Sequence, residues 1–154
     1  MAQMKGVVTG KVVSTNDPDH QGRVKVAFPY LGGQNESYWA PVATLLAGGG
    51  RGAWFMPEKE DEVLVAFNQD DVAHPYIIGF LWNGKDTPPD PKADNRVLVT
   101  PGGHTLRFED GGGKKVIIKS SSGQTITLDD SDGSITMQGG NRIFKMSDGL
   151  VQIS

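Results

Sequence analysis

Several common features are missing from this sequence. It has no cysteine, which excludes disulfide bonds and thiolate metal ligands and is consistent with a reducing compartment. No apolar run approaches the length of a membrane-spanning helix, and the first residues, MAQMKGVVTGKVV, lack the long apolar segment of a signal peptide. We therefore expect the protein to be made in the cytoplasm without a leader.

Positive charge is scarce and dispersed. The chain has 15 Lys and Arg against 18 Asp and Glu, a formal net charge of −3, and no block of basic residues. A generic nucleic-acid surface normally shows a basic stripe, so this composition predicts no nucleic-acid partner.

Helical periodicity is missing beyond a few residues, whereas Gly (21) and Pro (9) are abundant among the 154 residues. This combination predicts an all-β protein. The length allows one ordinary domain and an appendage.

Short strand-like segments fill the first half of the chain. Residues 23–28 alternate apolar and charged side chains, and residues 75–82 are nearly all apolar, which predicts a strand at the centre of a barrel. The glycine-rich stretch 47–52 is predicted to be a flexible loop. Five or six such strands, kinked at glycines, predict a Greek-key barrel of the oligonucleotide/oligosaccharide-binding (OB) type over residues 1–83. The predicted strands are residues 5–14, 23–28, 38–43, 61–67 and 75–82.

The segment after the barrel differs in composition. Residues 84–96 combine turn residues with three prolines and almost no apolar surface, which predicts a semi-rigid, extended connector.

Residues 97–154 repeat a short pattern. Short apolar segments recur every eight to eleven residues between clusters of Gly, Asp, Ser and Asn. Within each segment, apolar residues mostly alternate with polar ones. Each segment is therefore predicted to be a strand with one apolar face. A single-layer sheet with one solvent-exposed face is only marginally stable. The apolar faces of these strands therefore need a second layer, from this chain or from copies of it.

Six stretches of the chain carry a resemblance to known proteins. They are GRVKVAFP (22–29), YWAPVA (38–43), WFMPEKEDEVLVAF (54–67), HPYIIGFLWNGKDTPP (74–89), TPGGHTLRFED (100–110) and ITLDDSDGSITM (126–137). Together they resemble the spike module of contractile injection machines, and the resemblance covers essentially the whole chain, in order. This family includes the valine-glycine repeat protein G of type VI secretion, baseplate assembly protein V of phages, and the spikes of extracellular injection systems.

The resemblance implies a homotrimer without enzymatic activity. Three barrels would form a collar, and three tails would form an intertwined β-prism whose apolar faces fill its axis. The spike sits at the front of a rigid tube and punctures a membrane when a sheath contracts. The residues expected in the trimer core are Leu106, Phe108, Ile126, Leu128, Ile135, Met137, Ile143, Val151 and Ile153.

Two departures from larger family members bear on the expected partners. The barrel begins within a few residues of Met1, so a separate hub protein would join the spike to the tube, and neither a lysozyme domain nor a terminal metal-binding histidine motif is present. The last residues, Val151, Gln152, Ile153 and Ser154, continue as a strand. We expect a small proline-alanine-alanine-arginine repeat tip protein to cover them. Effector cargo, and the choice between phage tail, type VI apparatus and extracellular particle, stay open.

Alternative sites carry weaker signals. His20, His74 and His104 share no motif, and the acidic turns at 17–22 and 129–133 do not match a calcium loop. Asp70, Asp71 and His74 fit a hairpin connection better than half of a hydrolytic site. We therefore expect no catalytic residue, metal or cofactor.

The competing function is a binding module, in which an OB barrel takes an oligonucleotide or a glycan and the tail is flexible. Aromatic residues could stack bases in such a barrel, but the net negative charge favours barrel-core or trimer contacts for them. These aromatics are Phe28, Tyr30, Tyr38, Trp39, Trp54 and Phe55.

Overall fold

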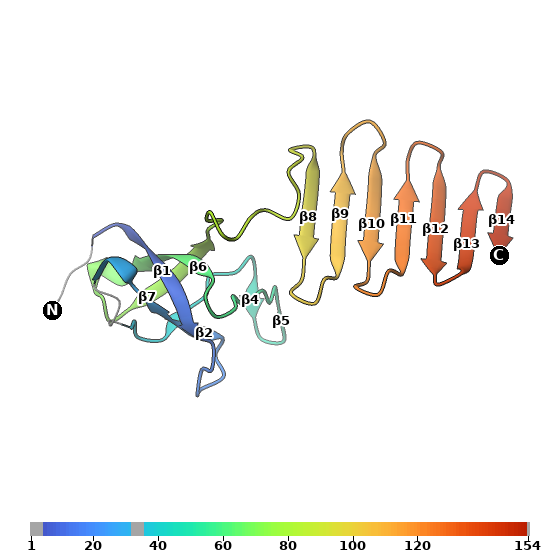
Figure 1. Cartoon of the computed structure of the whole chain (residues 1–154). Helices are drawn as coiled ribbons and strands as arrows, with labels where there is room; N and C mark the ends of the chain where they lie inside the picture. The colour runs from blue at the N-terminus through green and yellow to red at the C-terminus, as the bar shows by residue number, and fades with distance from the viewer. Residues whose placement is uncertain (1–4, 32–35, 154) are drawn as a thin grey trace. The chain divides into compact units, whose positions relative to one another are not determined.

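The computed structural model describes residues 5–31 and 36–153 (Figure 1). The chain divides into two compact units, residues 1–87 and residues 88–154, and each is described by itself. Strands dominate both units. The short 3-10 turns η1 (Pro29–Leu31) and η2 (Asn68–Asp70) are the helical elements among the described residues. The prediction of an all-β protein is confirmed.

The first unit is a five-stranded barrel. Its main strands are β1 (Val7–Ser14), β2 (Arg23–Ala27), β3 (Ala40–Pro41), β6 (Glu62–Phe67) and β7 (Pro75–Phe80). They pair in the order β3-β2-β1-β6-β7. A parallel bridge between Val42 and Ile77, with the Ala43 amide donating to the Ile77 carbonyl at 2.8 Å, brings the chain after β3 against β7. The sheet is therefore nearly closed, with the strand order of an OB barrel.

The barrel core comes from strict alternation. In β6, every second residue is buried, and β2 follows the same pattern. Because successive side chains of a strand point to opposite faces, one apolar set per strand fills the interior. The buried apolar residues are Val12, Val24, Val26, Phe28, Ala40, Val63, Val65, Phe67 and Ile77.

A buried carboxylate holds the turn between β1 and β2. Asp17 Oδ2 accepts hydrogen bonds from the backbone amides of Gln21 (2.9 Å) and Arg23 (3.2 Å), and Asp17 Oδ1 accepts one from Asp19 (3.1 Å). The Arg23 guanidinium adds bonds of 3.0 Å from Nε and 2.6 Å from Nη2. The Arg23 side chain, followed by these amides, holds the pKa of Asp17 well below its usual range.

Two local predictions in this unit are wrong. Residues 47–52 form a small hairpin of β4 (Ala47–Gly48) and β5 (Arg51–Gly52), closed by a Gly49-Gly50 turn in which Gly50 has φ of 68°. Glycine adopts this conformation without strain, so the same residues that suggested flexibility make a regular turn. Strand β7 is buried on one side only, because Tyr76, Ile78 and Phe80 face outward.

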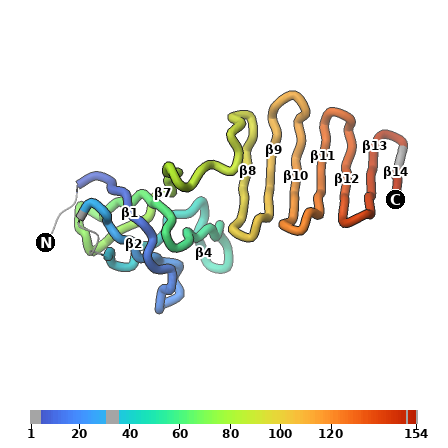
Figure 2. Tube along the Cα trace, in the orientation of Figure 1, coloured from blue at the N-terminus to red at the C-terminus, as the bar shows by residue number. Residues whose placement is uncertain are grey.

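The second unit is a seven-stranded antiparallel meander (Figures 1 and 2). Each strand pairs with its neighbours in sequence, and the connecting turns alternate between the two edges of the sheet. The first strand begins at Asn95, inside the segment predicted as a connector. The strands are β8 (Asn95–Val99), β9 (Thr105–Glu109), β10 (Lys115–Lys119), β11 (Thr125–Asp129), β12 (Ser134–Gly139), β13 (Arg142–Ser147) and β14 (Leu150–Ile153).

Candidate functional site

The register of the meander places apolar side chains in two rows on one face of the sheet. Residues directly opposite each other in neighbouring antiparallel strands share a face, so the pairings trace each row from strand to strand. One row runs Leu98, Leu106, Ile118, Ile126, Met137, Phe144 and Ile153. The other runs Arg96, Phe108, Val116, Leu128, Ile135, Met146 and Val151. We call these two rows, without Arg96, the apolar face.

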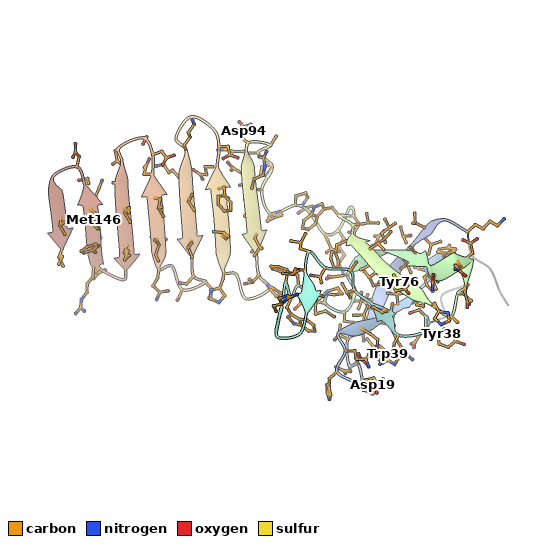
Figure 3. All side chains as sticks on the ribbon, turned by 180° about the vertical axis from the view of Figure 1, so that it is seen from behind. Asp19, Tyr38, Trp39, Tyr76, Asp94 and Met146 are labelled. Atoms are coloured by element: carbon orange, nitrogen blue, oxygen red, sulfur yellow. The ribbon has the colours of Figure 1, made fainter. Side chains whose placement is uncertain are left out.

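Nothing in the described residues of the second unit buries this face. Ile126 keeps 37% of its surface exposed and Ile153 keeps 80%. Ser134 is the single buried residue among those described in this unit. A contiguous apolar surface of this kind on a folded protein marks an interaction site. The apolar face is therefore the candidate functional site, and Figure 3 shows its side chains along the sheet, with Met146 labelled on β13.

The opposite face is mostly polar and carries ion pairs, although Val97, Ile117 and Ile143 also lie on it. The Lys115 ammonium lies 2.7 Å from Asp129 Oδ2, and Arg107 Nη2 lies 2.6 Å from Asp90 Oδ2. The hydrogen bond from Lys115, assisted by Ser131, lowers the pKa of Asp129 to about 2. A face that carries these pairs together with threonines is suited to water.

The predicted trimer-core residues fall on the apolar face, with one exception. Ile143 pairs with Gln138 and lies on the polar face, whereas its neighbour Phe144 pairs with Met137 in the apolar row. The grouping of Ile143 with the other core residues is therefore wrong. In β13, apolar Ile143 and Phe144 are adjacent, so alternation alone does not choose between them and the pairing with β12 decides.

Sequence reasoning missed five members of the apolar face. Residues 116–118 form an apolar segment in the sequence. Because all three are apolar, alternation does not show which of them share a face. Counting register outward from Ile126 and Leu128 would have resolved it. The missed residues are Leu98, Val116, Ile118, Phe144 and Met146.

The predicted tip-interface residues divide between the two faces. Val151 and Ile153 lie on the apolar face and are highly exposed, whereas Gln152 pairs with Lys145 on the polar face. Ser154 lies outside the described residues.

The barrel carries a groove of about 480 Å³ beside the β4–β5 hairpin. Gly22, at φ of 74°, approaches the Trp54 ring so closely that a Cβ there would lie 2.7 Å from it. Of the aromatics considered for base stacking, barrel-core packing or trimer contacts, Phe28 is buried, whereas Tyr30, Tyr38, Trp54 and Phe55 are exposed. Barrel-core packing is therefore wrong for these four residues, and trimer contacts stay a prediction for them. Lys25 Nζ lies 5.4 Å from the ring centre of Trp39.

The titratable residues singled out in the sequence have local structural roles. His74 Nδ1 lies 3.0 Å from Asp71 Oδ2, and Asp71 also accepts a hydrogen bond from the Ala73 amide. The Ala73 amide, followed by His74, lowers the pKa of Asp71. Within residues 5–31 and 36–153, no group of three or more His, Cys, Asp or Glu side chains is placed to hold a metal ion. No helix in the same part of the chain is long and apolar enough to span a membrane.

Comparison with known proteins identifies relatives of both units. Residues 8–82 match the family described as the type VI secretion system/phage-baseplate injector OB domain. The chain is 36% identical to the type VI secretion system spike protein VgrG5 of Pseudomonas aeruginosa, in an alignment 124 residues long that covers 72% of the chain. It is 31% identical to the spike protein VgrG4b of the same organism, in an alignment 130 residues long that covers 76% of the chain. The matched region spans 16% of the length of each of these two relatives.

Proposed function

Through its barrel, residues 8–82, the chain belongs to the type VI secretion system and phage-baseplate injector OB-domain family, and from this premise we propose that it is a structural, membrane-puncturing spike. In this proposal the protein cuts no bond. It acts as part of a contractile injection machine, which is a phage tail, a type VI apparatus or an extracellular particle. The particle carries the protein to the target or releases it outside the cell.

One observation carries the proposal. Downstream of an injector-type barrel, seven consecutive strands present the unbroken apolar face, with residues such as Ile126 and Leu128 exposed in the single chain. A sheet that exposes such a face gains stability by burying it against further sheets. Three copies around one axis would bury all three faces in a common core.

The mechanism would be mechanical. In a prism of three meanders, the backbone hydrogen bonds run between strands within each sheet, and the apolar rows fill the axis. Because the contacts are shared among three chains, local unfolding of one chain would require loss of contacts in the other two. Such a shaft resists the axial load of sheath contraction.

The partners follow from the two units. The barrels would form a collar that joins a separate hub protein of the baseplate. At the other extreme of the meander, β14 pairs only with β13 among the described residues, and Val151 and Ile153 stay exposed. A proline-alanine-alanine-arginine repeat tip protein would cover this edge, since an exposed apolar strand edge otherwise invites aggregation.

The deciding experiment combines light scattering with limited proteolysis of the full 154-residue chain. The proposal predicts three times the chain mass of 16.5 kDa and a shaft that resists protease. Monomer mass with rapid loss of residues after the barrel would contradict it. That outcome would favour the alternative, an OB module that binds an oligonucleotide or a glycan.

A further inference from the structure

The two edges of the meander differ in charge. On one edge lie the β9–β10, β11–β12 and β13–β14 turns. Residues 109–115, 129–134 and 147–150 around these turns contain Glu109, Asp110, Asp129, Asp130, Asp132 and Asp148 against two basic residues, Lys114 and Lys115. On the other edge lie the β8–β9, β10–β11 and β12–β13 turns. Residues 99–105, 119–125 and 138–142 around these turns contain no Asp or Glu but include His104, Lys119 and Arg142. Figure 1 shows the turns alternating between the two edges.

Three of these charges border the apolar face. Asp130 follows Leu128 by two residues, Asp148 follows Met146 by two, and Arg142 precedes Phe144 by two. A spacing of two residues keeps the same side within a strand, so Arg142, the first residue of β13, lies on the side of the apolar face. Asp130 and Asp148 stand in the turns directly after β11 and β13.

Among the described residues, these three charges have no ion-pair partner. Asp129 and Asp132, in the same turn, are engaged by Lys115 and Lys145 at 2.7 and 3.1 Å. Among residues 5–31 and 36–153, by contrast, no ion pair involves Asp130, Asp148 or Arg142, and all three are exposed.

Arg142 and Asp148 lie at the two ends of the same strand. Arg142 is the first residue of β13, and Asp148 directly follows Ser147, its last residue. The two charges therefore stand at about the same height along the ladder, at opposite edges of the sheet. Asp130 directly follows β11, two strands or about 10 Å away along the ladder.

Rotational symmetry brings unlike edges together. In a cyclic trimer with its axis along the ladder, all copies stand at the same height, and one edge of each sheet meets the opposite edge of the next. We infer that, in the trimer of the proposed function on which this inference rests, Arg142 of each copy pairs with Asp148 of its neighbour. These contacts would close the corners of the prism and set the axial register of the chains.

The test reverses each edge separately and then both together. Arg142→Glu places like charges in every corner, and so does Asp148→Arg. The double variant Arg142→Glu, Asp148→Arg exchanges the two charges and restores opposite charges across each corner. Lys59→Glu, an exposed barrel residue without an ion pair among the described residues, has the charge change of Arg142→Glu and serves as its control.

Sedimentation of the full chain, in a fixed urea concentration that half-dissociates the wild type, measures the result. We expect either edge reversal to raise the trimer dissociation constant about tenfold or more at low salt, since three corners change together. The effect should shrink at 1 M salt, where the Debye length is about 3 Å. The double variant should return to within about threefold of the wild type.

The outcomes separate the inference from the proposed function. A trimeric wild type whose edge reversals behave like Lys59→Glu overturns the corner contacts and leaves the spike intact. Edge reversals that dissociate without rescue in the double variant also overturn the contacts, because loss of fold would then explain the weakening. A wild type that is not trimeric overturns the spike proposal itself.

Discussion

The barrel and the meander use the same alternation of apolar and polar residues with opposite results. In the barrel, β1, β2, β6 and β7 curve around residues such as Val65 and Ile77, which are 0% exposed. In the meander, Ile126 and Ile135 follow an equally regular pattern and are both 37% exposed. Alternation therefore defines an apolar face but not what covers it.

The difference comes from closure. The contact of the segment after β3 with β7 turns the first sheet on itself, so one chain supplies both walls of its core. The seven strands of the meander pair only in sequence order, which leaves a sheet with two open ends among the described residues. An open sheet needs another layer to bury its apolar face, whereas the strands of a closed barrel bury their own apolar faces.

The largest expected effect comes from placing charge on the apolar face. Ile126→Asp or Ile135→Asp would bury three carboxylates per trimer without partners, and we expect complete loss of trimers with the barrel still folded. Light scattering reports the mass. Tryptophan fluorescence reports the barrel alone, since Trp39, Trp54 and Trp82 all lie in the first unit.

The matched control for this change is Thr127→Asp. Thr127 lies between Ile126 and Leu128 in β11 and pairs with Thr136 on the polar face. We expect it to keep trimers at wild-type mass. Normal trimers from Ile126→Asp would refute the assignment of this face to a trimer core.

A smaller effect distinguishes the two sides of β7. Ile77→Ala empties a site in the closed barrel core and should cost about 2–5 kcal/mol of barrel stability. Ile78→Ala, next to it but 46% exposed, should change stability by about 0.5 kcal/mol or less. Urea unfolding followed by tryptophan fluorescence measures both. Equal losses would mean that the outer side of β7 is covered by a partner.

The smallest expected effects are pH-dependent and occur in both units. The pKa values of Asp17 and Asp129 are lowered on folding by Arg23 and Lys115 respectively, the latter to about 2 from 3.8. A lowered pKa means that the stabilisation is fully present above about pH 4 and is lost as pH falls through the folded pKa. Asp17→Asn should therefore lower the urea midpoint of the barrel at pH 7 and flatten its decline in acid.

Asp129→Asn should do the same for the trimer, by less. The Lys115–Asp129 pair is more exposed to solvent than the Arg23–Asp17 pair, and exposed pairs contribute less. Urea-induced dissociation between pH 7 and pH 2, followed by sedimentation, measures it. An unchanged pH profile in either variant would show that the corresponding pair does not titrate as described.

Sequence patterns predicted most strands of the barrel because its inward residues are unambiguous, as with Val24 and Val26 in β2. The patterns failed where the same residues are compatible with two different structures. Glycines at 47–52 suggested a flexible loop but form a hairpin, and the apolar run in β7 suggested two buried sides but has one. Ile143 was misassigned because Phe144 beside it is also apolar, and only cross-strand pairing separates the two.

The amino-acid sequence by itself determined that this protein is all-β and that its second half carries one apolar face, because side chains alternate along every strand whatever the strand packs against. Only the tertiary structure decided which strands close the barrel, which residue of each adjacent apolar pair joins the face, and which charges border it. Those outcomes depend on pairing between segments distant in sequence, and alternation along a single strand carries no information about its partners.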